Sequence, residues 1–214
     1  MFSKHELQNI ISGNGQVRHG ETIQTVLSFL RRKKKAISDA EKTKFSKIEE
    51  TKVLIEFADQ HNFWHTDIYE TRYIGEGAEQ QIYEFSNPNF VIKLNDGIFY
   101  EYCEDYLHSL LLHNYFFTHL AYELIGFTIN KGTFSTVVKQ PFVVATENTN
   151  LDHVKDFLGV NGFVNKKNND YFNPELGIIL EDLHDENVLT SDGVLQFIDT
   201  VFFITKEFYE PVRE

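Results

Sequence analysis

The chain has 214 residues, 42% of them hydrophobic and 24% charged, which is typical of a globular protein and excludes a wholly disordered chain. Its 20 Lys and Arg against 32 Asp and Glu give a formal net charge of −12, carried almost wholly beyond residue 70, which argues against a nucleic-acid-binding surface there. A single cysteine excludes an intramolecular disulfide, and no apolar run reaches the length of a signal peptide or a membrane span, so we expect a soluble, cytoplasmic protein without nucleic-acid or membrane partners.

The first 60 residues have a helical pattern. Residues 21–36 repeat apolar side chains at helical spacing, and the basic run Arg31–Lys35 follows, where we expect the helix to end and the cations to be solvated. Ser38 and Glu41 have the spacing of a capping box and predict the start of a second helix. The apolar stripes of the two helices are expected to pack on the rest of the chain: Ile23, Val26, Leu27 and Leu30 in the first, Phe45, Ile48 and Ile55 in the second.

From residue 70 onward, short β-rich runs replace the helical pattern. The predicted order is three strands, one long helix that starts after the break at 95–97, and two further strands. The five strands are expected at 71–74, 81–85, 90–94, 124–130 and 134–144. A short helix near 151–158, a loop at 165–170 and apolar runs at 177–180 and 194–198 complete the chain.

Two segments in the β-rich part have residues suited to binding phosphate. Gly75 and Gly77 form a G-x-G between two predicted strands, where backbone without Cβ can approach phosphate closely, although a plain hairpin has the same pattern. Lys93 lies in an apolar strand and either points its ammonium at phosphate oxygens or faces solvent.

A third segment places oxygen ligands around a turn. Asp182 and Asn187 stand at the two ends of an Asp-x-x-x-x-Asn loop between apolar residues, and the run 194–198 then leads to Asp199. Amide and carboxylate oxygens are ligands suited to Mg²⁺ bound with polyphosphate, and the first aspartate is placed to accept a proton from an attacking hydroxyl.

The order of glycine loop, strand lysine, D-x-x-x-x-N and later aspartate resembles a protein-kinase-like fold over residues 71–200. The phrase D-L-H-D-E-N-V-L at 182–189 is similar to the D-L-H-x-x-N-[IV]-L of aminoglycoside and choline phosphotransferases. In its small size the chain also resembles the kinase-like domain of polyvalent proteins from phages and bacterial conjugative elements.

The resemblance implies a role for each of these residues. Gly75 and Gly77 would cover the phosphates of ATP, and Lys93 would hold the α- and β-phosphates. Asp182 would be the catalytic base, with Asn187 and Asp199 as ligands of Mg²⁺. A glutamate in the third turn of the helix after the lysine would pair with Lys93, and Glu104 fits best when counted from Gly97, with Glu101 and Asp105 as alternatives. His184 would either orient Asp182 or be structural, and we favour the structural role.

The chain departs from the pattern in several places. Gln80 replaces the third glycine of the loop, and Leu180 replaces the histidine two residues before the catalytic aspartate. The glycine of Asp-Phe-Gly is absent, because Thr200-Val201 follows Asp199 in place of Phe-Gly. Few residues remain after Asp199, which leaves no room for an activation segment or a large helical subdomain.

Together these observations predict an α+β, two-lobed protein-kinase-like fold with a truncated C-terminal lobe. The expected segments are a helical extension at 1–66, an N-lobe with a five-stranded sheet and one long helix at 67–146, and a minimal C-lobe at 147–214. A hinge near 139–146 would contact the adenine. The expected activity is ATP- and Mg²⁺-dependent transfer of a phosphoryl group to a hydroxyl of a small molecule or protein. The alternative is an inactive kinase-like module that binds nucleotide or a protein partner.

Overall fold

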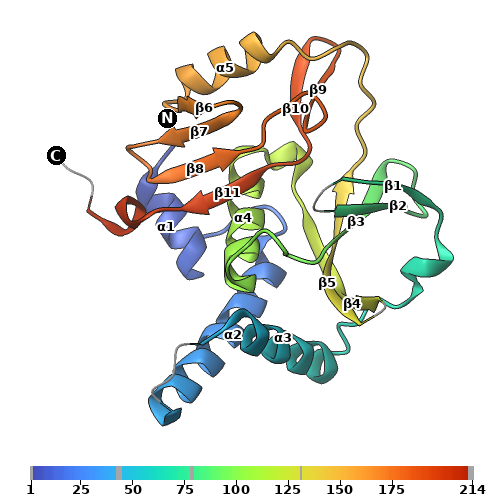
Figure 1. Ribbon diagram of the computed structural model, residues 1–214, viewed down its shortest axis with the longest axis vertical. Coiled ribbons are helices and arrows are strands. Elements are labelled where there is room, and N and C mark those ends of the chain that lie inside the picture. Colours follow the sequence, from blue (N-terminus) through green and yellow to red (C-terminus); the bar gives the residue numbers. More distant parts are fainter. Residues whose placement is uncertain (1, 42–44, 78–79, 131, 212–214) are drawn as a thin grey trace. The chain divides into compact units, whose positions relative to one another are not determined.

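The computed structural model describes residues 2–41, 45–77, 80–130 and 132–211, and within them the chain is a mixture of helices and antiparallel sheets (Figure 1). The helices are α1 (Lys4–Ser12), α2 (Gly20–Glu41), α3 (Lys47–His61), α4 (Cys103–Phe116) and α5 (Leu151–Val160). The strands are β1 (Tyr73–Glu76), β2 (Gln80–Glu84), β3 (Phe90–Asn95), β4 (Glu123–Asn130), β5 (Thr133–Pro141), β6 (Val164–Lys167), β7 (Asp170–Asn173), β8 (Ile178–Glu181), β9 (Val188–Ser191), β10 (Val194–Phe197) and β11 (Val201–Ile204). The predicted α+β class is confirmed. Among the described residues, no helix combines the length and the apolar character needed to span a membrane.

The residues group into two compact units. One, the five-stranded unit, comprises Arg18–Leu107 and Ala121–Phe142, and the other, the four-stranded unit, comprises Met1–Val17, His108–Leu120 and Val143–Glu214. Helix α4 contributes its start to the first unit and its remainder to the second. The helices of the expected N-terminal extension are therefore shared: α1 belongs to the four-stranded unit, and α2 and α3 belong to the five-stranded unit.

The sheet of the five-stranded unit has the order β1-β2-β3-β5-β4, with all neighbours antiparallel. The five strands predicted from the sequence are thus all present, each within a few residues of its expected bounds. Strand β3 lies in the middle of the sheet, as its apolar composition predicts. Its Ile92 and Leu94 join a buried cluster with Tyr83 and Val137 on one face of the sheet. Because side chains alternate along a strand, Lys93 points to the opposite face.

Helices α2 and α3 lie side by side and both contact β4 (Figure 1). The apolar stripe of α2 is buried as predicted, but the stripe of α3 is formed by Val53, Leu54, Phe57 and Ala58. The predicted member Ile48 is 70% exposed instead.

The boundary between these two helices differs from the prediction. Helix α2 continues through the basic run and through Ser38 to Glu41, so the cations lie along the helix and not at its end. The capping box that opens α3 is formed by Ser46 and Glu49, where the Ser46 N–H donates to Glu49 Oε2 at 2.6 Å. Two Ser-x-x-Glu patterns stand within ten residues of each other, and only the second precedes an apolar stripe that the sheet can bury.

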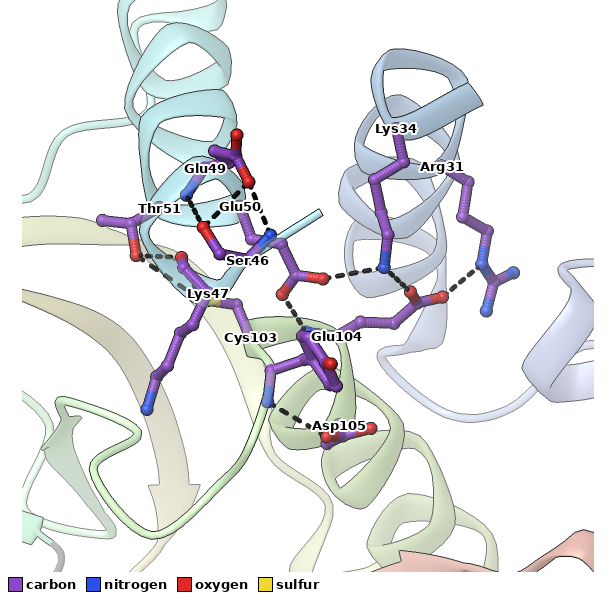
Figure 2. Close-up of polar contacts among 11 residues, drawn as sticks. Arg31, Lys34, Ser46, Lys47, Glu49, Glu50, Thr51, Cys103, Glu104 and Asp105 are labelled. Atoms are coloured by element: carbon purple, nitrogen blue, oxygen red, sulfur yellow. Dashed lines mark hydrogen bonds and ion pairs between the residues drawn. The ribbon is translucent and has the colours of Figure 1, made fainter. Parts of the chain in front are cut away.

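The basic run of α2 meets acidic side chains of α3 and α4 (Figure 2). Lys34 Nζ lies 2.8 Å from Glu50 and 2.9 Å from Glu104, and Arg31 Nε lies 2.7 Å from the same Glu104. Glu50 is fully buried on α3 and accepts the Glu104 N–H at 3.2 Å, so its carboxylate caps the first turn of α4. Arg31 and Lys34, which were predicted to be solvated, therefore link α2 to α3 and to the start of α4 through ion pairs.

We expect Lys34→Met to lower the free energy of unfolding by about 2 kcal/mol, because it leaves the buried Glu50 carboxylate without its cation. Burial lowers the pKa of Lys34, but its hydrogen bonds and charge interactions with Glu50 and Glu104 outweigh burial and raise it. The stabilisation is therefore present at neutral pH and is lost only as the pH rises above the ordinary lysine value of 10.5. Urea unfolding at pH 7 measures this difference.

The neighbouring Lys33 provides the matched control. It pairs with Glu56 at 2.5 Å, but both side chains are more than one-third exposed, so Lys33→Met should change the stability by less than about 1 kcal/mol. Adding Glu50→Gln to Lys34→Met should restore part of the loss. Equal effects of the Lys33 and Lys34 substitutions would contradict the assignment.

The four-stranded unit contains a sheet of order β11-β8-β7-β6 and a separate hairpin of β9 and β10. Its core is aromatic: Phe116 and Phe117 at the end of α4 stack on Phe202 and Phe197, with ring centroids 5.3 and 4.3 Å apart. The segment 165–170, expected to be a loop, is instead the turn of the β6–β7 hairpin. Helix α5 begins at Leu151 as predicted and contacts β6 (Figure 1).

Candidate functional site

The glycine segment and Lys93 lie in one row across the five-stranded sheet. Gly75 is the cross-strand partner of Ile82, Ile82 of Lys93, and Lys93 of Val138. Cross-strand partners share a face, so Gly75 and Lys93 face the same side at about two strand spacings, roughly 10 Å. The sheet therefore brings together the two phosphate-binding candidates of this unit.

The two glycines are not required by the packing of the protein. A Cβ added at Gly75 or Gly77 would meet no described atom within 4 Å, and neither residue has a positive φ. The Gly77 N–H donates to the carbonyl of Gln80 at 2.9 Å and closes the turn between β1 and β2. Residues 78 and 79 of this turn lie outside the described residues. The glycines are thus compatible with close approach of a ligand from this side.

Lys93 is the buried cation of this face. Only 3% of it is exposed, and its Nζ lies 5.5 Å from the centre of the Tyr122 ring. This burial excludes the solvent-facing side chain that the sequence left as an alternative for Lys93.

A pocket of about 540 Å³ opens at the edge of the same sheet. Its lining includes Ile74, directly before Gly75, and Val91, which shares the face of Lys93 two residues away. Phe142, the first residue after β5, completes it, and the size suits an aromatic base. A larger pocket of about 680 Å³, lined by parts of α1 and of the segment 207–211, contains none of the predicted site residues.

In the four-stranded unit, the loop 182–187 follows strand β8. Asp182 has a φ of 64°, in the left-handed region that aspartate tolerates better than most residues, and its side chain is 53% exposed. Its N–H donates to Asp170 Oδ1 at 3.2 Å, which ties the loop to the β6–β7 hairpin. The Asp182 side chain thus stands at an exposed turn that the hairpin holds in place.

Two side chains hold the Asp182 carboxylate. Asn187 Nδ2 donates to Asp182 Oδ2 at 3.0 Å and to the Asp182 carbonyl at 2.8 Å. The Glu186 N–H donates to Nδ1 of His184, and Nε2 of the same ring lies 3.3 Å from Asp182 Oδ1 and 3.1 Å from Asn187 Nδ2. These contacts favour an orienting role for His184, contrary to the structural role that we preferred from the sequence.

Asp199 lies beside this loop. It is the second residue after β10, and the N–H groups of Ile198 and Asp199 both donate to the carbonyl of Asn187, at 3.0 and 3.2 Å. The structure therefore brings Asp182, Asn187 and Asp199 together in the four-stranded unit. Their convergence with Lys93 remains a prediction.

Negative charge accumulates at this loop. Burial, followed by the charges of Asp170 and Asp182, raises the pKa of Glu181. Glu181, Asp170 and Asp182 therefore place several acidic side chains near one another at this loop.

A family model of serine/threonine/tyrosine kinases found in polyvalent proteins matches residues 47–206. The chain belongs to this kinase family. The match includes the glycine row, Lys93 and the whole cluster of Asp182, Asn187 and Asp199, and it begins at α3, so α1 and α2 lie outside it. No curated protein matches the chain.

A kinase implies a divalent cation with its nucleotide, and the donors present fit Mg²⁺. The hydrogen bonds of the Asn187 amide to Asp182 use Nδ2, so its oxygen Oδ1 could serve as a ligand, and the carboxylate of Asp199 would be a second hard ligand. Magnesium is commonly bound by one or two protein oxygens, with phosphate and water completing the octahedron. Asn187 and Asp199 are the residues that would hold it.

The environment of Glu104 differs from what the sequence suggested. Helix α4 begins at Cys103 and not after Gly97, so Glu104 lies in its first turn. Its carboxylate is held by Arg31 and Lys34 of α2 (Figure 2). Its pairing with Lys93, like that of the alternatives Glu101 and Asp105, remains a prediction. The third turn of α4 has no acidic residue and ends at the buried His113.

His61 and His65 stand four residues apart, a spacing that on one helix would point both rings at one metal. They do not share a helix, because α3 ends at His61, and the His61 ring stacks on Phe57 at 4.3 Å. No group of three or more His, Cys, Asp or Glu side chains in the described part of the chain is arranged to hold a metal.

Two functional features were missed in the sequence. Asp170 supports the loop from the β6–β7 hairpin, and the Asn168-Asn169 pair between two short runs was a turn signal that pointed to this hairpin. The contacts of His113 had no local signal, because its partner Thr200 is 87 residues away.

Proposed function

We propose that the chain is an ATP- and Mg²⁺-dependent phosphotransferase that moves the γ-phosphoryl group to a hydroxyl. The observation that carries this proposal is the exposed Asp182 carboxylate, which Asn187 and His184 contact. The backbone N–H of Asp199 donates to the backbone carbonyl of the same asparagine. A base and two hard oxygen ligands in one loop cluster are the groups that phosphoryl transfer needs.

In this proposal, Asp182 accepts the proton of the attacking hydroxyl as the bond from its oxygen to the γ-phosphorus forms. The bond between the γ-phosphorus and the oxygen that bridges it to the β-phosphate breaks, and ADP leaves. When bound, Mg²⁺ neutralises phosphate charge, and Asn187 and Asp199 are its protein ligands. Lys93 and the backbone of Gly75–Gly77 bind phosphate oxygens, and the pocket beside Val91 and Phe142 takes the base. Catalysis then depends on positioning and electrostatic stabilisation.

The pairing of the sheet limits which residues of the hinge expected at 139–146 can contact the base. Lys139 and Gln140 are paired with β3 in the sheet, so backbone groups that contact the base would come from residue 142 onward. The acceptor is proposed to be a hydroxyl of a protein or a small molecule.

Lys93→Met tests the proposal. It keeps the length of the side chain and removes the charge, so we expect nucleotide affinity to fall about 10- to 100-fold while the fold is retained. Titration calorimetry with a non-hydrolysable ATP analogue and Mg²⁺ measures the affinity, and transfer of label from γ-labelled ATP to the protein or to added acceptors measures turnover.

Lys139→Met is the matched control. Lys139 lies on the adjoining strand β5 but pairs with Glu123 at 2.7 Å, on the face opposite to Lys93, so its loss should leave nucleotide affinity unchanged. If the parent binds nucleotide but shows no turnover, the inactive kinase-like module is favoured. The departures from the kinase motifs at Gln80 and Thr200 are the sequence feature that agrees with this alternative. No affinity in the parent would refute the proposal.

A further inference from the structure

Two of the buried polar side chains of helix α4 lie on one face. Ser109 and His113 are four residues apart, and both are at most 2% exposed. The Ser109 hydroxyl accepts the Phe202 N–H at 3.0 Å, and His113 Nδ1 lies 2.7 Å from Thr200 Oγ1. The two side chains therefore hold alternate residues of the segment that enters β11.

The hydrogen bonds of His113 assign its tautomer. Nε2 lies 3.1 Å from the carbonyl of Leu120, which can only accept, so Nε2 donates. In the neutral ring Nδ1 is then the acceptor, and the Thr200 hydroxyl donates to it. Both partners are buried, which makes loss of this hydrogen bond costly.

Asp199 lies between two anchored residues. Its own N–H is bonded to Asn187, Thr200 on one side is bonded to His113, and Phe197 on the other side stacks on Phe117 of the chain segment that follows α4. The backbone on both sides of Asp199 is therefore held in place.

We propose that His113 is a positioning residue for the cation ligand Asp199 and acts through the hydroxyl of Thr200. This inference rests on the proposed function. Thr200 stands where the resemblance placed the residue after the metal-binding aspartate, and a buried hydrogen bond to α4 holds it there. The consequence is a loop whose aspartate is set for Mg²⁺ before nucleotide binds.

Thr200→Val tests the inference, because it removes the hydroxyl and keeps the shape. The measurement is the Mg²⁺ concentration that gives half-maximal binding of a non-hydrolysable ATP analogue, which does not depend on turnover. We expect this concentration to rise about tenfold in Thr200→Val, by the loss of one buried hydrogen bond. Thr200→Ser keeps the hydroxyl and should stay within about twofold of the parent, and Thr200→Ala provides a second variant that lacks it.

Ser109→Ala is the matched control. It removes one buried hydrogen bond from the same helix face to the same segment, but at Phe202, three residues from Asp199. The melting temperature of Ser109→Ala should fall as much as that of Thr200→Val. Its half-maximal Mg²⁺ concentration should stay at the value of the parent. The inference is overturned if Thr200→Val and Thr200→Ala both need the same half-maximal Mg²⁺ concentration as the parent. It is also overturned if Ser109→Ala raises this concentration as much as Thr200→Val does. Either result would leave the proposed function intact. A parent without Mg²⁺-dependent binding would instead refute the proposed function.

Discussion

Asp182→Asn should lower phosphoryl turnover by about 10²- to 10⁴-fold and leave Mg²⁺-nucleotide affinity near that of the parent. Asparagine tolerates the left-handed backbone at this position, where φ is 64°, so the loop should keep its conformation. Its amide oxygen can still accept from Asn187 or His184, but it cannot take the proton of the acceptor hydroxyl. Initial rates of label transfer and calorimetric affinities, measured on the same preparations, separate the two effects.

Asp192→Asn is the control for this prediction. Asp192 is exposed, has a φ of 49° in the turn between β9 and β10, and undergoes the same chemical change in the same backbone region. It should retain parental turnover. A parental rate in Asp182→Asn, or a loss of nucleotide affinity equal to its loss of turnover, would remove Asp182 from the role of base.

Asp199→Asn should remove most of the Mg²⁺-dependent part of nucleotide affinity, by about 100-fold, and turnover should fall with it. A neutral amide does not balance the charge of the metal–phosphate complex. In the proposed site the neutral Asn187 is a ligand beside the carboxylate of Asp199, whereas the Asp199→Asn variant would offer two neutral amides. Titration of the protein with the ATP analogue, with and without Mg²⁺, measures the Mg²⁺-dependent part of the affinity directly.

Asp182→Asn and Asp199→Asn remove the same charge from the same unit. If the acidic surface acted only through its total charge, the two variants would have equal Mg²⁺-dependent affinities. We expect them to differ, and equal affinities would contradict the separate roles of base and cation ligand.

Local sequence determined the strands and the loops that they position. The alternating and apolar runs predicted all five strands of the β1–β5 sheet, because hydrophobic periodicity is set by which face each strand buries. The order of Gly75, Lys93, Asp182, Asn187 and Asp199 along the chain was sufficient to recognise the kinase family, which the match over residues 47–206 confirms.

Helix ends could be predicted less well. Ser38 and Ser46 both start a Ser-x-x-Glu pattern, and α3 begins after the second because its stripe at Val53, Leu54 and Phe57 is the one buried there. Similarly, the break at Gly97 did not begin α4. Lys47 of α3 donates to the carbonyls of Gly97 and Tyr100, so the segment before Cys103 is held as a loop.

Residue patterns and chain order thus predicted the fold class, the glycine segment and Lys93 as phosphate-binding candidates, and the grouping of Asp182, Asn187 and Asp199. Only the tertiary structure decided which side chains meet across long separations: Arg31 and Lys34 with Glu104, Asp170 with Asp182, and His113 with Thr200. The physical reason is that periodicity records which side of an element is buried, whereas the partner of a buried charge or hydroxyl is set by the packing of elements distant in sequence.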